Sequence, residues 1–155
     1  TSYLLGLRYL TQRNATYIAE VYHNGTGYLE SEADQFYQLV DAAFAQANPS
    51  ATSVLLQKAL ALGNGPYGKP FAGENYAYVR VQQQDAFGIV YFQPALFALV
   101  NLDDGSFQVT PELDYTGYKN VELRLRLYLL EGNSMTDFGD KPNERKLELY
   151  MRYYF

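Results

Sequence analysis

The sequence predicts an all-β fold, an antiparallel meander of about seven strands with one helical insertion. Two observations lead to this prediction: polar and apolar residues alternate along several segments, and every second connection between the segments is short. Hydrophobic residues make up 48% of the 155 residues, which excludes a disordered chain. The length allows at most one domain.

The C-terminal segment has the clearest alternation. From Lys146 to Phe155, every second residue is apolar and most of the others are charged or polar. The same period of two runs from Val121 to Leu130 and from Phe107 to Tyr115, where Pro111 is the exception because it cannot donate a ladder hydrogen bond. These three segments are predicted to be strands with one apolar and one polar face.

Four further strands are predicted upstream. Their ranges are Tyr3–Thr11, Thr16–His23, Tyr76–Gln84 and Gly88–Leu102, and the last of these is apolar on both faces. The connections Gln12–Asn14, Gln84–Phe87 and Thr116–Asn120 are tight, whereas Asn24–Asn75, Asp103–Ser106 and Glu131–Asn143 provide the other connections. This rhythm is typical of an antiparallel meander with one plain end and one elaborated end.

The long connection 24–75 is predicted to contain two short helices. The first covers Ser31–Ala47, with Ser31 and Asp34 as a possible cap, and the second begins at Asn48-Pro49 and stops at Gly63. A strand over Thr52–Leu60 is the alternative for the second. We expect the two apolar stripes to fold against residues 88–102 and to constrict or plug the fold, or else to form a lid packed on its own loop. The stripes contain Phe36, Leu39, Val40, Phe44, Val54, Leu55 and Leu62.

Strand length favours a membrane-spanning sheet. Strands of soluble sandwiches usually have about five or six residues, whereas several of these reach about ten, the length that a tilted strand needs to cross hydrocarbon. Many tyrosines also lie near the predicted strand ends, where the ring can sit at the headgroup level. The fold class predicted is therefore a transmembrane β-barrel.

The polar faces of the last three strands would line the lumen of such a barrel. They carry charges of both signs that could form a structural cross-strand network or a transverse field across a pore. The predicted lumen-lining residues are Glu112, Asp114, Glu122, Arg124, Arg126, Lys146, Glu148 and Arg152.

The chain resembles Gram-negative outer-membrane β-barrel proteins of the porin-like type. In that family the last strand typically ends in Phe, preceded by apolar residues at alternate positions, and Leu147, Leu149, Met151, Tyr153 and Phe155 match this signal. The resemblance implies an outer-membrane location, contact with the lipid bilayer and reading of the signal by the barrel assembly machinery. It also implies that Phe155 is periplasmic and that the long loops, including 24–75, are extracellular.

Seven strands conflict with the even strand number of bacterial single-chain barrels. We therefore expect residues 1–155 to be the C-terminal part of a larger barrel whose remaining strands come from another chain or fragment. A barrel shared by several copies and an overlooked eighth strand are the alternatives.

The expected function is a channel for small solutes, and a sleeve for a partner protein or an exported polymer is the alternative. A hydrolase is a less favoured reading, because His23 is the single His and has no Ser partner at a characteristic spacing. With no Cys and one His, no metal or other cofactor is expected. The pI near 4.8, without a Lys/Arg cluster, excludes nucleic acid as a partner.

Overall fold

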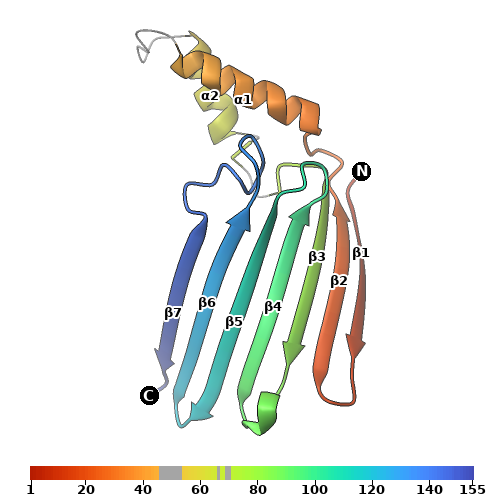
Figure 1. The fold of residues 1–155 in the computed structure, drawn as a ribbon, viewed down its shortest axis with the longest axis vertical. Helices are drawn as coiled ribbons and strands as arrows, with labels where there is room; N and C mark the ends of the chain where they lie inside the picture. Colours follow the sequence, from red (N-terminus) through yellow and green to blue (C-terminus); the bar gives the residue numbers. More distant parts are fainter. Residues whose placement is uncertain (46–53, 66, 69–70) are drawn as a thin grey trace.

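The structure, a computed structural model, describes residues 1–45, 54–65, 67–68 and 71–155. Seven strands form one sheet in sequence order, and every neighbouring pair is antiparallel, so the predicted seven-stranded meander is confirmed (Figure 1). The strands are β1 (Tyr3–Leu10), β2 (Ala15–His23), β3 (Asn75–Gln83), β4 (Phe92–Asn101), β5 (Phe107–Tyr118), β6 (Val121–Glu131) and β7 (Arg145–Tyr153).

The sheet is open and is not a closed barrel. Within the part of the chain that the structure describes, β1 pairs only with β2 and β7 pairs only with β6. One long side of each of these two strands therefore has no backbone partner, and the predicted closed barrel is not formed by these residues alone.

The connections follow the predicted rhythm. The turns that join β1 to β2, β3 to β4 and β5 to β6 lie at one end of the sheet, which we call the turn end (Figure 1). The connections 24–74, 102–106 and 132–144 lie at the other end, which we call the loop end. Asn14 and Asn120 close two of the tight turns with φ of 57° and 61°, a conformation that Asn tolerates better than most residues.

Strand β4 is shorter than predicted. It begins at Phe92 instead of Gly88, because residues 84–91 form a turn around the short helix η1 (Ala86–Gly88). Asp85, Phe87 and Tyr91 have positive φ there, which breaks the extended conformation. In the sequence, the apolar residues of this turn look like part of a buried strand. In the structure they belong to the turn, and Phe87 is 87% exposed.

Strand β5 is longer than predicted and continues to Tyr118 past an irregularity in its register after Tyr115. Pro111 lies inside this strand and pairs with Leu96 of β4. The pairing with β6 skips Thr110 and Pro111, as expected because Pro111 has no N–H to donate.

The long connection contains the two predicted helices, α1 (Glu30–Phe44) and α2 (Val54–Asn64). Helix α1 starts one residue earlier than predicted, and the carboxylate of Glu32, not Ser31, caps it by accepting a hydrogen bond of 3.1 Å from the Leu29 N–H. Helix α2 continues one residue beyond Gly63. The predicted Asn48-Pro49 cap lies outside the described residues. Neither helix, as far as it is described, is long and apolar enough to cross a membrane.

The helices pack on each other beyond the loop end of the sheet (Figure 1). The rings of Phe36 and Tyr67 stack with 4.1 Å between centroids, and Tyr28 stacks on Tyr67 at the same distance. The ring of Phe36 also lies next to Gly63 of α2. In the described part of the chain the two helices contact each other, and no comparable packing on β4 is found. This arrangement is closer to the alternative of a lid packed on its own loop, although Phe44 and Val54 of the predicted stripes stay 64% and 80% exposed.

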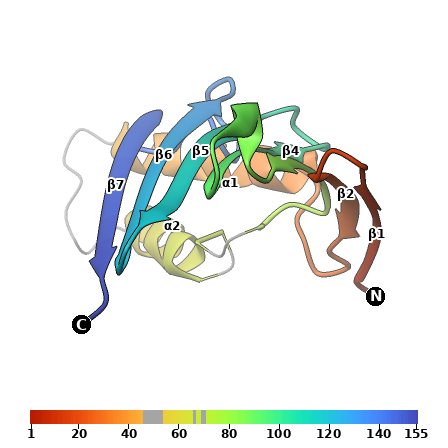
Figure 2. The same ribbon diagram turned by 90° about the horizontal axis from the view of Figure 1, so that it is seen from below.

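The sheet is bent into an arc with β1 and β7 at its two ends (Figure 2). Side chains that share one face of β1 to β6 line a single hollow of about 610 Å³. This face is therefore the concave face, and the opposite face is convex. Because the register is regular, each row of paired residues lies wholly on one face or the other.

Candidate functional site

The convex face is apolar from β1 to β7. Its central rows contain Leu, Val, Ala, Pro and Met without a charged residue. Among the described strand residues, the charges on this face are Glu131 and Arg145, which lie at the loop end. None of its apolar side chains is buried, and the exposed fraction reaches 69% at Leu5 and 78% at Leu149. No second layer of the described protein covers this face.

Aromatic residues border the convex face at the turn end. Tyr9 pairs with Tyr17, Phe92 pairs with Tyr115, and Tyr153 pairs with Val121. Several of the tyrosines expected near strand ends therefore lie together at this end of the convex face. Tyr22, Tyr76 and Tyr78 also lie near strand ends, but on the concave face.

The eight charged residues predicted to line a lumen all lie on the concave face. Glu112 is central among them, because its side chain is 4% exposed and lies between two arginines. Arg126 Nε donates a hydrogen bond of 2.5 Å to Glu112 Oε2, and Arg124 Nε is 3.9 Å from the same oxygen. Glu112 thus depends on both arginines of β6 for compensation of its charge.

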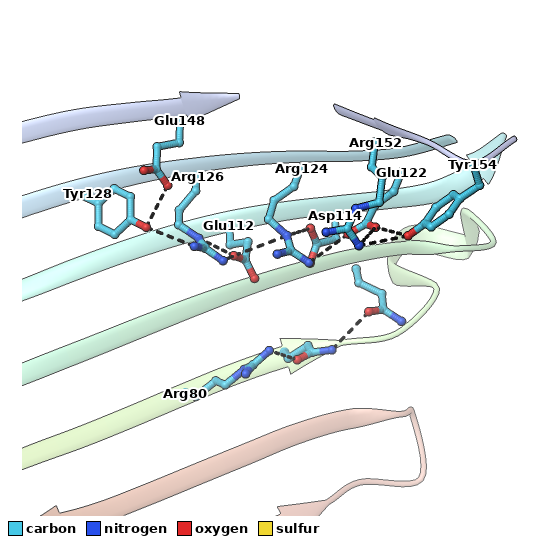
Figure 3. Close-up of polar contacts among 12 residues, drawn as sticks. Arg80, Glu112, Asp114, Glu122, Arg124, Arg126, Tyr128, Glu148, Arg152 and Tyr154 are labelled. Carbon is cyan, nitrogen blue, oxygen red and sulfur yellow. Dashed lines mark hydrogen bonds and ion pairs between the residues drawn. The ribbon is translucent and has the colours of Figure 1, made fainter. Parts of the chain in front are cut away.

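The network continues towards the turn end (Figure 3). Arg124 Nε donates to Asp114 Oδ1 at 2.6 Å, and its Nη2 donates to Glu122 Oε1 at 3.2 Å. Glu122 accepts a further hydrogen bond from the hydroxyl of Tyr154 and lies 3.7 Å from Arg152. One arginine therefore joins carboxylates of two neighbouring strands.

Towards the loop end the network passes through Tyr128 (Figure 3). The Tyr128 hydroxyl accepts a hydrogen bond from Arg126 and donates one of 3.0 Å to Glu148. Lys146 Nζ is 2.5 Å from the other oxygen of Glu148. Across β5 to β7, four carboxylates are thus matched by four cationic side chains, as the cross-strand interpretation of the sequence predicted.

The hollow of about 610 Å³ on the concave face is mostly apolar and aromatic. Leu4 of β1, Tyr22 of β2 and Tyr78 of β3 line one side, while Phe97 and Leu99 of β4 line its floor. Phe97 and Leu99 lie on the same face as the charged residues of β5. The hollow itself was not predicted. Residues of β1 to β3 form part of its wall, and polar and apolar residues alternate less regularly along these strands than along β5 to β7.

A smaller pocket of about 330 Å³ lies on the concave face of β1 to β3 at the turn end. Arg8 and Arg80 line it together with Ile18 and with neutral polar side chains such as Gln82. These arginines were not among the predicted site residues. The sequence did contain a signal for Arg8. If the two strands on either side of the tight turn Gln12–Asn14 are paired residue by residue outward from the turn, Arg8 lies opposite Ile18.

Aspartates organise the loop end. Asp103 Oδ2 accepts hydrogen bonds from the backbone N–H groups of Glu74 and Asn75, while Asp104 Oδ2 accepts one of 2.7 Å from Asp137 N–H. The hydroxyl of the buried Tyr76 donates to Asp137 at 2.8 Å. These bonds tie the long connection and the β4–β5 and β6–β7 loops together, a role that the sequence did not reveal.

Helix α1 is attached to this loop layer through Tyr37, whose hydroxyl donates to the Thr136 carbonyl at 3.4 Å. Burial, together with nearby Asp140 and Asp137, raises the pKa of Tyr37 to about 12. Because the pKa is higher in the folded than in the unfolded chain, the stabilisation is complete below pH about 10 and is lost as the pH rises towards about 12.

Burial also raises the pKa of Tyr76 and of Tyr67. We therefore expect tyrosinate absorbance to lose one late-titrating tyrosine in Tyr37→Phe, while Tyr76 and Tyr67 still titrate late. In the unmodified chain, cleavage of the α1 segment by an added alkali-stable protease should accelerate over the same pH interval. A titration of Tyr37→Phe identical to that of the unmodified chain would contradict this assignment.

His23 lies at the loop end of the convex face. Its Nδ1 is 2.9 Å from Asn75 Oδ1, and its ring stacks on Tyr3 with 4.9 Å between centroids. An amide, not a carboxylate, therefore orients the ring. Among the described residues, no group of three or more metal-ligating side chains could hold a metal ion.

Four of the five residues of the expected assembly signal share one face. Leu147, Leu149, Met151 and Tyr153 lie on the convex face of β7, and Phe155 follows the strand with its ring 5.1 Å from that of Tyr153. Phe155 is itself outside the strand, which ends two residues earlier than predicted.

Comparisons with known proteins found no similar protein. No model of a known family, no curated protein and no solved structure matches this chain. Its function is therefore argued from its own sequence and geometry.

Proposed function

We propose that this chain forms part of the wall of an outer-membrane β-barrel channel that passes small solutes. The observation that carries the proposal is the polarity of the curved sheet, which is apolar over its whole convex face and densely charged on the concave face of β5 to β7. A curved sheet that encloses an apolar core in water has the opposite polarity, because its concave side must bury the apolar residues.

The convex face supports contact with hydrocarbon. In water, its exposed leucines and valines would form a continuous apolar patch that spans seven strands, which is unusual for a soluble monomer. The strands have eight to twelve residues, enough for tilted strands to cross a bilayer. The aromatic border at the turn end would lie at the level of the lipid headgroups.

The unpaired sides of β1 and β7 support the presence of further strands. A backbone N–H or C=O without a partner costs several kcal/mol in hydrocarbon, so both edges have to be paired there. Further strands that close the sheet would turn the concave face into a lumen wall. These strands could belong to the same polypeptide or to another chain.

The resemblance of the C-terminal segment to that of outer-membrane β-barrel proteins supports the orientation that we propose. The loop end, with α1 and α2, faces the outside of the cell, and the turn end faces the periplasm. Leu147, Leu149, Met151, Tyr153 and Phe155 are then the signal that the barrel assembly machinery reads. The helices would cover the outer mouth as a lid and leave the middle of the lumen free.

Conductance measurements in planar lipid bilayers test the proposal. The protein extracted from native membranes should produce discrete conductance steps. Arg124→Gln leaves the carboxylates of Asp114 and Glu122 uncompensated, so it should shift the reversal potential in a salt gradient towards cation selectivity. Arg145→Gln, on the convex side at the loop end, is the matched control and should leave the selectivity unchanged. An absence of conductance steps from the folded protein would overturn the proposal.

A further inference from the structure

The concave face of β1 to β3 carries two cationic side chains without a carboxylate partner. Arg8 and Arg80 both pair with Ile18, so the three residues form one row across three strands. A strand spacing of about 4.8 Å places the two arginine backbones about 10 Å apart. Neither guanidinium has a carboxylate within 4 Å among the residues that the structure describes.

The charges elsewhere on the concave face do not compensate these arginines. The carboxylates of β5 to β7 are already engaged by Arg124, Arg126, Arg152 and Lys146. On β1 to β4 the single acidic residue that faces this side is Glu20, which lies one row nearer to the loop end and forms no ion pair with either arginine. The row therefore has a surplus of positive charge.

The apolar hollow begins directly beside this row. The guanidinium carbon of Arg80 lies 4.8 Å from the centroid of the Phe97 ring, and Phe97 lines the hollow. Figure 3 shows the Arg80 side chain on β3 opposite the charged network of β5 to β7. Tyr22, Tyr78 and Leu99 continue the wall of the hollow towards the loop end.

We propose that the hollow and the Arg8–Arg80 row together bind an organic anion that has an aromatic body and a carboxylate. The aromatic body packs against Phe97, Tyr78 and Leu99, and the carboxylate accepts charge-assisted hydrogen bonds from the guanidinium groups. The hollow of about 610 Å³ has the size of a small-molecule site. The inference rests on the proposed channel function and names the class of its solute.

Calorimetric titration of the full chain in detergent micelles tests the site with three probes. Benzoate combines the two features, benzyl alcohol lacks the charge, and acetate lacks the aromatic body. We expect benzoate to bind at least about tenfold more tightly than either of the others, after subtraction of a micelle blank.

The variants separate the two halves of the site. Arg80→Gln and Arg8→Gln should each weaken benzoate binding about tenfold and leave benzyl alcohol binding unchanged. Arg8 is exposed, so Arg8→Gln keeps the test valid if Arg80→Gln fails to fold. Arg145→Gln is the control with the same loss of charge outside the site, and it should bind benzoate normally.

Two results would overturn the inference: equal affinity for benzoate and one of the other two probes, or benzoate affinity that neither arginine variant changes. These results are independent of the channel proposal. Conductance without selective benzoate binding removes this inference alone, whereas benzoate binding without conductance removes the channel and retains the site.

Discussion

Replacing Leu149 with arginine is expected to destabilise the protein in a lipid bilayer by about 2–4 kcal/mol, because the new charge would face the middle of the hydrocarbon. Leu149 lies at the centre of β7 on the convex face and is 78% exposed. In a water-soluble protein, substitution of so exposed a side chain usually changes stability by no more than about 0.5 kcal/mol. Urea unfolding of the protein in lipid vesicles measures the difference.

A matched variant controls for the added charge. Gln93→Arg introduces the same side chain on the concave face, directly opposite Asp114, and should leave the stability nearly unchanged. If both variants unfold at the same urea concentration as the unmodified protein, the convex face does not contact lipid.

The second large effect is expected at Glu112. Glu112→Gln should lower the free energy of unfolding by about 2–3 kcal/mol, because Arg126 loses the carboxylate that neutralises it and Arg124 loses a weaker ion pair of 3.9 Å. The arginine side chains are 28% and 35% exposed, which places the cost below that of a fully buried unpaired charge.

A double-mutant cycle tests whether the ion pair of Glu112 with Arg126 accounts for this loss of stability. Glu112→Gln combined with Arg126→Gln should cost less than the sum of the two single changes, by about 1–2 kcal/mol. Lys146→Gln is the control, since the pair of Lys146 with Glu148 is well exposed and its loss should be hardly measurable. Strict additivity at Glu112 and Arg126 would show that the two side chains act independently.

Strict alternation explains why β5 to β7 could be predicted from the sequence. From Val121 to Leu129 the apolar residues are convex, and the residues between them, charged except for Tyr128, are concave. The pattern therefore predicted both the strand and the charged face. Arg8 and Arg80 were missed because their strands mix aromatic and apolar residues on both faces. Only the cross-strand register shows that they share a row.

Apolar residues led to a wrong strand boundary at the start of β4. Residues 86–91 are largely apolar, yet positive φ at Phe87 and Tyr91 makes them a turn. The apolar stripes of the two helices were recognised in the sequence, but the residues on which they pack were not. Phe36 packs on Tyr67 and close to Gly63, and sequence periodicity alone cannot choose between such a partner and a strand of the sheet.

Single-tryptophan scanning of β7 tests the central claim most directly, because the chain contains no Trp of its own. Tryptophan is placed in turn at residues 147 to 151, and its fluorescence is measured in bilayers whose acyl chains carry bromine as a quencher. The proposed channel wall predicts strong quenching at Leu147, Leu149 and Met151 and weak quenching at Glu148 and Tyr150. Equal quenching at all five positions, or none at Leu149, would contradict a lipid-facing convex surface.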